Sequence, residues 1–96
     1  MITSFGDRRR EDLFHGKVTN RIRRLPKEIH EIATRKLDMI NAAMTVGDLK
    51  SPPNNRLKPL RGDLKGFYSI RINDQWRIVF RWTHGDASEV KIVDYH

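Results

Sequence analysis

The sequence contains no cysteine, and no long run of apolar residues occurs anywhere in it. Without cysteine the chain has neither a disulfide framework nor a thiolate nucleophile. A membrane-spanning helix needs about 20 consecutive, mostly apolar residues, so none is expected here. The first twelve residues, MITSFGDRRRED, also lack the apolar core of a signal peptide. We therefore expect a cytoplasmic protein with no membrane partner.

Patterns that bind metal ions or cofactors are missing as well. The four histidines are scattered along the chain, and no His-x-x-His or Asp-x-Asp spacing occurs, although such spacing is the usual signature of a metal site. The segment GDLKG at residues 62–66 is too short for a phosphate-binding loop and lacks the flanking strand and helix. We expect a protein that works without a metal ion or a cofactor.

Positive charge is the property that the chain has in excess. Nineteen Lys and Arg residues stand against twelve Asp and Glu, which gives a formal net charge of +7 over 96 residues. Such a charge predicts attraction to a polyanion or to an acidic protein. Charge alone does not separate RNA, DNA and an acidic protein partner, and a surface that is merely soluble is the alternative interpretation.

Helical patterns fill the first half of the chain. In residues 26–43, Pro26 suits a first helical turn and apolar side chains recur at the 3–4 spacing of a helix. The buried stripe expected from this spacing consists of Ile29, Ile32, Ala33, Leu37, Ile40 and Met44. Residues 7–16 predict a second, shorter helix between Asp7 as N-cap and Gly16 as stop signal.

Alternating patterns fill the second half. A break at residues 51–55, SPPNN, precedes three runs that predict strands at residues 66–72, 75–82 and 88–95. Residues 2–5 alternate weakly and predict a short first strand. Short connections make the three later strands an antiparallel meander. The expected fold class is α+β, a small antiparallel sheet packed against two N-terminal helices, in one domain of residues 1–96.

A three-residue hairpin loop fixes the register of the first two predicted strands. It places Ile70 opposite Ile78 and Arg71 opposite Arg77, so one face is apolar and the other carries arginines. The side chains expected to join the arginines from the last strand are Lys91, Val93 and Tyr95. Like charges that face each other across strands destabilise a sheet. Their pairing favours a bound anion, and splayed, solvated arginines are the alternative.

Cleavage of an RNA phosphodiester without metal requires a base for the 2′-OH proton, an acid for the 5′-oxygen and cations beside the phosphorane. Tyr95 and His96 are candidate proton carriers, and Asp94 is placed to orient the imidazole. The planar guanidinium of arginine and the compact ammonium of lysine both bind phosphate oxygens well. The candidates for this role are Arg71, Arg77, Lys58 and Arg61.

The string NRLKPLRGDLKGFYSIRINDQWRIVFRW at residues 55–82, followed by VKIVDYH at 90–96, resembles the HigB-like toxins of the RelE/ParE superfamily. These are the toxins of bacterial toxin–antitoxin pairs. The resemblance includes the opening ITSF and covers essentially the whole chain. It implies the microbial-ribonuclease-like RelE fold and cleavage of messenger RNA in the A site of the 70S ribosome. It also implies a HigA-type helix-turn-helix antitoxin, through which the toxin contacts operator DNA only indirectly.

Carried over residue by residue, the family's catalytic tail falls on Asp94, Tyr95 and His96, with Lys58 and Arg71 as further catalytic residues. The RNA-binding residues that the resemblance implies are Arg61, Arg77, Lys65, Arg56 and Lys91. Some members of the family carry a histidine in the stretch where this sequence has Lys58. The general base therefore stays open between Lys58 and His96.

Two functions of different class remain. The first is a metal-independent, ribosome-dependent endoribonuclease of a type II toxin–antitoxin system, which the terminal Tyr-His pair favours. The second is a protein that poisons DNA gyrase without catalysis, as in the ParE branch of the superfamily. Basic side chains in the helical half are expected to meet an acidic antitoxin or the rRNA backbone. They are Arg8, Arg9, Arg10, Arg21, Arg23 and Arg24.

Overall fold

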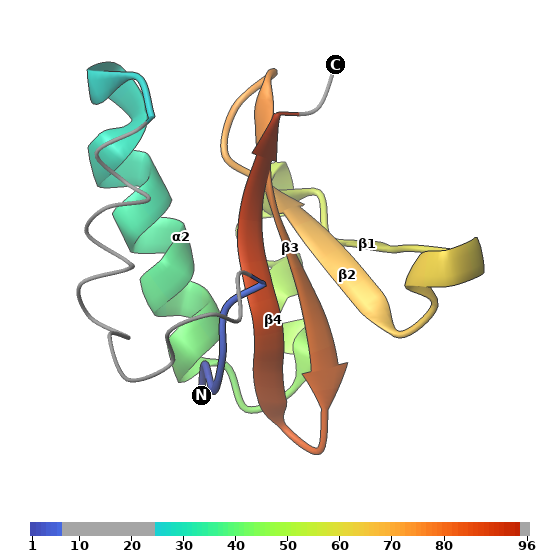
Figure 1. Cartoon of the computed structure of the whole chain (residues 1–96). Helices are drawn as coiled ribbons and strands as arrows, with labels where there is room; N and C mark the ends of the chain where they lie inside the picture. Colours follow the sequence, from blue (N-terminus) through green and yellow to red (C-terminus); the bar gives the residue numbers. More distant parts are fainter. Residues whose placement is uncertain (7–24, 95–96) are drawn as a thin grey trace.

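The computed structural model describes residues 1–6 and 25–94 (Figure 1). The predicted short helix at residues 7–16, the six arginines between residues 8 and 24, and the tail residues Tyr95 and His96 lie outside these ranges. In the described part the elements are the 3-10 turns η2 (Lys27–Ile29), η3 (Val46–Lys50), η4 (Pro53–Asn55) and η5 (Gly62–Leu64), the helix α2 (His30–Ala42), and the strands β1 (Lys58–Pro59), β2 (Phe67–Arg71), β3 (Trp76–Thr83) and β4 (Asp86–Asp94). No helix in this part is long and apolar enough to cross a membrane.

The helix predicted at residues 26–43 is present as η2 followed by α2. Ile29, Ala33, Leu37 and Ile40 are buried at the predicted spacing, because each packs into the core beneath the helix. The prediction for Met44 is wrong, since its side chain is 81% exposed. Helix α2 ends at Ala42, and the next residue is already extended, so the chain has left the helical face before it reaches Met44.

The strands form one antiparallel sheet in the order β1-β2-β3-β4. The predicted strands at residues 66–72, 75–82 and 88–95 correspond to β2, β3 and β4. The predicted register is confirmed, since Ile70 pairs with Ile78 and Arg71 with Arg77. Strand β1 was not predicted. It has only two residues and a proline, so no alternation is visible, and its backbone is placed by pairing with β2.

The first residues of the chain line the outer edge of β4. Bridges join Ile2 to Ala87 and Phe5 to Val90, and both are parallel. The Thr3 backbone N–H donates to the Ala87 carbonyl at 2.8 Å. The predicted first strand is thus an extended edge segment with isolated bridges. This segment protects the edge of β4, which would otherwise expose unpaired backbone groups.

The core lies between α2 and the apolar face of the sheet, as Figure 1 shows from the edge of β4. Ile70, Ile78, Phe80 and Val90 are 0% exposed. The pairing of β3 with β4 shifts by one residue between Val79 and Arg81, which marks a β-bulge. Successive side chains of a strand point to opposite faces, so the residues that alternate with these core residues lie on the other face of the sheet.

Candidate functional site

The face of the sheet that points away from α2 carries a set of basic side chains, which we call the arginine face. Its residues follow from the strand registers: Lys58 on β1, Phe67, Ser69 and Arg71 on β2, Arg77, Val79 and Arg81 on β3, and Lys91 and Val93 on β4. Lys58 pairs with Ser69, and Val79 pairs with Lys91. The structure therefore brings Lys58 and Lys91 to the same face as the two paired arginines.

Arg77 is held on this face by two neutral acceptors. Its Nε donates to Ser69 Oγ at 3.1 Å, and its Nη2 donates to the Arg56 carbonyl at 2.9 Å. Ser69 is only 2% exposed, so its hydroxyl is fixed by its surroundings. These two acceptors orient the planar guanidinium on this face, and a guanidinium held in one plane suits bidentate contact with phosphate oxygens.

Arg71 lies opposite Arg77 and forms an ion pair with Asp74 in the β2–β3 turn. The Arg71 side chain is 27% exposed, whereas that of Asp74 is 98% exposed. A solvent-exposed ion pair contributes at most about 1 kcal/mol. An RNA phosphodiester, which carries one negative charge, can therefore compete with the carboxylate of Asp74 for Arg71 and contact Arg77 as well.

A buried polar pair lies beside these arginines. Lys36 of α2 is 7% exposed and its Nζ donates to Oδ1 of Asn55, which is 0% exposed. The Asn55 amide in turn donates to the carbonyls of Leu49 at 3.2 Å and Ser51 at 3.3 Å. Burial lowers the pKa of Lys36, and the positive charges of Arg35 and Arg71 lower it further.

This pair connects α2 to the segment that carries the Arg56 carbonyl. Asn55 precedes Arg56, whose backbone is left-handed with φ 49° and whose carbonyl accepts from Arg77. Sequence reasoning missed both members of the pair. The available signal was the position of Lys36 on the apolar stripe, three residues after Ala33 and four before Ile40. Asn55 gave no such signal, because asparagine after proline suggests an ordinary exposed turn.

The other predicted cations are less closely grouped. Arg61 and Lys65 flank η5 in the connection between β1 and β2, and both are exposed. Lys91 leans toward the N-terminal segment, since a Cβ on Gly6 would come within 3.0 Å of its Cδ. Arg56 is exposed beside the anchor of Arg77. The structure therefore gathers part of the predicted set on the arginine face and leaves Arg61 and Lys65 in the adjoining connection.

The described chain ends with Asp94 at the end of β4. Asp94 pairs with Trp76, and its Oδ2 accepts from Gln75 Nε2 at 3.1 Å. This places Asp94 over the β2–β3 turn, at the same end of the sheet as Arg71 and Arg77. The roles expected of Tyr95 and His96 stay predictions, because both residues lie beyond the described part.

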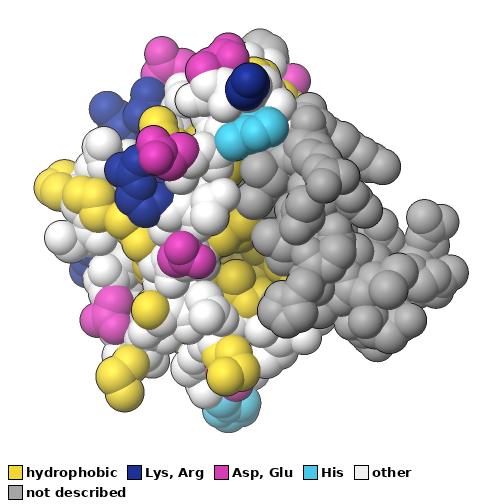
Figure 2. Space-filling view, turned by 90° about the vertical axis from the view of Figure 1, so that its left-hand side faces the viewer, with side chains coloured by type: hydrophobic (Ala, Val, Ile, Leu, Met, Phe, Trp, Pro, Cys, Tyr) yellow, Lys and Arg dark blue, Asp and Glu magenta, His cyan; other side chains and the backbone are white. Residues whose placement is uncertain are grey.

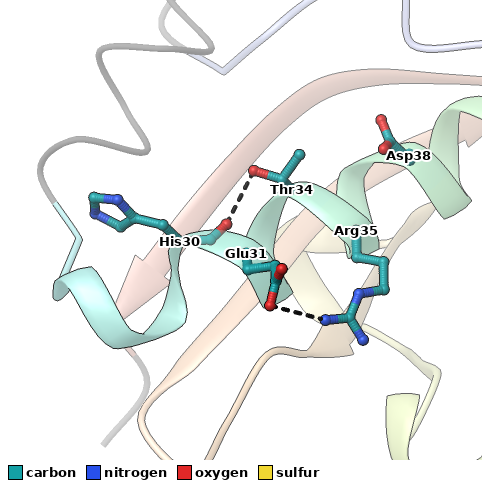
Figure 3. A pocket seen from close by; sticks show the side chains of 5 residues that line it. All are labelled: His30, Glu31, Thr34, Arg35 and Asp38. Atoms are coloured by element: carbon teal, nitrogen blue, oxygen red, sulfur yellow. Dashed lines mark hydrogen bonds and ion pairs between the residues drawn. The ribbon is translucent and has the colours of Figure 1, made fainter.

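A separate hollow of about 500 Å³ lies along α2. It is lined by His30, Glu31, Thr34, Arg35 and Asp38 (Figure 3). Figure 2 views the molecule from this side and shows acidic and basic side chains interspersed rather than gathered. The hollow contains no predicted site residue and lies across the sheet from the arginine face, so we assign it no part in the site. Within residues 1–6 and 25–94, no three His, Asp or Glu side chains are grouped as metal ligands are.

Comparison with known proteins points to one family. Residues 3–96 match the family described as "RelE-like toxin of type II toxin-antitoxin system HigB". Toxin HigB-1 of Vibrio cholerae is 38% identical over 87 residues, which cover 91% of this chain and 90% of that protein. Endoribonuclease HigB of Proteus vulgaris is 33% identical over 96 residues, the full length of both. The fold is similar to that of the YoeB dimer from Staphylococcus aureus, with a TM-score of 0.55, 22% identity, and coverage of 99% of this chain and 94% of that one.

Proposed function

Since the chain belongs to the HigB-like family of RelE-like toxins of type II toxin–antitoxin systems, we propose that it is a metal-independent endoribonuclease that cleaves messenger RNA and thereby inhibits translation. The full-length relative from Proteus vulgaris carries the name of an endoribonuclease, which supports this activity. The structural observation that carries the proposal is the pairing of Arg71 with Arg77 on the face of the sheet that points away from α2. A phosphodiester bound there gains two adjacent positive charges.

In this proposal the two arginines bind the scissile phosphate and stabilise the charge that develops on it. Ser69 and the Arg56 carbonyl hold Arg77 ready before RNA arrives. Because the acceptors are already in place, little side-chain ordering remains for the moment of binding. Arg56, Lys65, Arg61 and Lys91 extend the positive surface along the strand of RNA.

The proton transfers are assigned to the end of the chain and to β1. In the sequence Tyr95 and His96 follow Asp94, the last residue of β4, and Asp94 lies at the end of the sheet where Arg71 and Arg77 lie. Lys58 lies opposite Ser69, the residue that holds Arg77. Either Lys58 or His96 takes the 2′-OH proton. One proton is then given to the leaving 5′-oxygen, by Tyr95 if His96 is the base, or by Tyr95 or His96 if Lys58 is the base. Asp94 orients the tail.

We further propose that the cut is made in the A site of the 70S ribosome, in the cytoplasm of a bacterium. The positive charge of +7 suits an environment of phosphates. A HigA-type helix-turn-helix antitoxin neutralises the toxin and connects it to operator DNA. We assign the cleavage and the binding of these partners to one domain of residues 1–96.

The test is to express Tyr95→Phe and His96→Ala variants and to map cleaved messages by primer extension. Arg35→Gln serves as a control, because it removes an exposed arginine on α2, away from the arginine face. We expect the control to arrest growth and cut messages like the parent, and the tail variants to lose both effects. If both tail variants cut as the parent does, the catalytic role of the tail is refuted. DNA damage without message cleavage would instead support the gyrase-poison alternative.

A further inference from the structure

Two residues of the arginine face, Phe67 and Arg81, and Glu89 from the bulge in β4 have no role in the proposed chemistry. We call them the stacking cluster. Phe67 and Arg81 are partners across β2 and β3. The Arg81 guanidinium carbon lies over the Phe67 ring, 4.8 Å from its centroid. Arg81 Nε forms an ion pair with Glu89 Oε2 at 3.2 Å. The guanidinium is therefore fixed on one flat side and along one edge.

Glu89 reaches Arg81 because of the bulge in β4. The pairing with β3 shifts there, and Glu89 takes a left-handed backbone with φ 51°. Its backbone N–H donates to Ser4 Oγ at 2.9 Å, which secures the conformation from the N-terminal edge segment. This conformation is unfavourable for a residue with a side chain. Bulges are used to redirect a side chain, and here the extra residue directs a carboxylate at Arg81.

The outer side of the Arg81 plane remains accessible, since the side chain is 46% exposed. Phe67 is 7% exposed, so its ring supports the arginine and is itself covered. A planar guanidinium is a good stacking partner for an unpaired base. The Glu89 carboxylate, 37% exposed, accepts hydrogen bonds only and therefore suits the N–H donors on a base edge.

The spacing connects this cluster to the phosphate clamp. Arg77 and Arg81 lie four residues apart on the same side of β3, or about 13 Å at ~3.3 Å per residue. A stacked nucleic-acid strand covers that span in about four nucleotides at ~3.4 Å each, and an extended strand covers it in fewer. One short segment of RNA can therefore contact both places.

We propose that Arg81, held between Phe67 and Glu89, is a stacking subsite for an unpaired nucleobase of the RNA strand whose phosphate is bound by Arg71 and Arg77. The subsite rests on the proposed function, because it requires RNA on the arginine face. An exposed ion pair by itself contributes little to stability. The left-handed backbone of Glu89 in the bulge places the ion pair with Arg81. A role in ligand binding explains this unfavourable backbone better than a contribution to stability does.

The experiment measures binding of the full chain to a short 2′-O-methyl RNA by fluorescence anisotropy at low salt. The methyl groups block the 2′-OH, so the strand stays intact. An abasic site is moved along the oligonucleotide one position at a time. We expect one abasic position to weaken binding by about tenfold, as the loss of one stacked base does. In Arg81→Lys the intact strand should bind about tenfold more weakly, and the abasic scan should be flat. Arg35→Lys on α2 is the matched control and should behave as the parent.

A second variant tests the carboxylate. Glu89→Gln keeps the size of the side chain but adds a donor, so it should change the order of affinities for oligonucleotides of A, C, G and U. If the parent binds RNA with a flat abasic scan, or if Arg81→Lys scans like the parent, the subsite is wrong while the proposed function stands. If the parent does not bind RNA at all, the subsite is wrong, and the proposed function is decided separately by the mapping of cleaved messages.

Discussion

Asn55→Ala removes the side chain that connects α2 to the segment before β1. In the parent, the fully buried Asn55 accepts from Lys36 Nζ and donates to the carbonyls of Leu49 and Ser51. The variant leaves a buried ammonium and two carbonyls without these partners. An unsatisfied buried group costs about 1–3 kcal/mol, and a charged one costs more. We therefore expect the free energy of unfolding to fall by about 3 kcal/mol.

Urea unfolding measures this loss. With a slope of about 2 kcal/mol per molar for a domain of this size, the midpoint should fall by about 1.5 M. Asn54→Ala is the matched control, because Asn54 is the exposed neighbour of Asn55. Surface substitutions of this kind change stability by about 0.5 kcal/mol or less. An equal effect of the two variants would refute the structural role of Asn55.

A double-mutant cycle isolates the contact between the two side chains. Lys36→Met keeps an unbranched side chain and removes the charge, so Asn55→Ala in that background no longer strands an ammonium. We expect a coupling energy of at least about 1 kcal/mol. Additive effects within about 0.5 kcal/mol would contradict the hydrogen bond between Lys36 and Asn55.

The pH dependence gives the cycle an independent readout. The folded-state pKa of Lys36 lies below its ordinary value of 10.5, so between those two values the unfolded state binds more protons than the folded state. The free energy of unfolding of the parent should therefore rise with pH through this window, relative to Lys36→Met. If the difference between the two proteins stays constant up to pH 10.5, Lys36 is not buried as a charged group.

Two further variants test Arg77 and the residue whose carbonyl anchors it, Arg56. Arg56→Gly should raise the free energy of unfolding by up to about 1 kcal/mol, because glycine adopts φ near +50° without steric cost. Arg61→Gly is the control and should not raise the free energy of unfolding, because φ of Arg61 is −129°. A lower free energy of unfolding for Arg56→Gly in urea would contradict the argument. Arg77→Lys should lower RNA affinity by about tenfold, since lysine cannot reach Ser69 and the Arg56 carbonyl with one planar fork. Unchanged affinity in an anisotropy titration would remove Arg77 from the clamp.

The arginine pair could be predicted because two local signals agreed. The alternation of residues 66–72 and 75–82 assigned each side chain to a face, and the length of the hairpin loop fixed the register. Both signals lie within twenty residues of sequence. Arg71 and Arg77 therefore pair as the sequence predicts.

The errors and omissions arise where distant segments decide the structure. Met44 fits the helical period, but Asp48 accepts from the backbone N–H groups of Met44 and Thr45, which begins η3 instead. The parallel pairing of residues 1–6 with β4 joins the two ends of the chain, and no local pattern specifies it. Lys36 and Asn55 are nineteen residues apart, and neither residue type suggests burial by itself.

The chemistry of the cleaved ends tests the central claim most directly. Attack by the 2′-oxygen, with a proton given to the leaving 5′-oxygen, leaves a 5′-hydroxyl on the downstream fragment. Purified toxin is incubated with ribosomes programmed with a defined message, and the fragments are labelled by polynucleotide kinase with and without prior phosphatase. We predict full labelling of the downstream fragment without phosphatase, and no fragments with Arg77→Lys/His96→Ala. A downstream fragment that labels only after phosphatase carries a 5′-phosphate and would contradict the account.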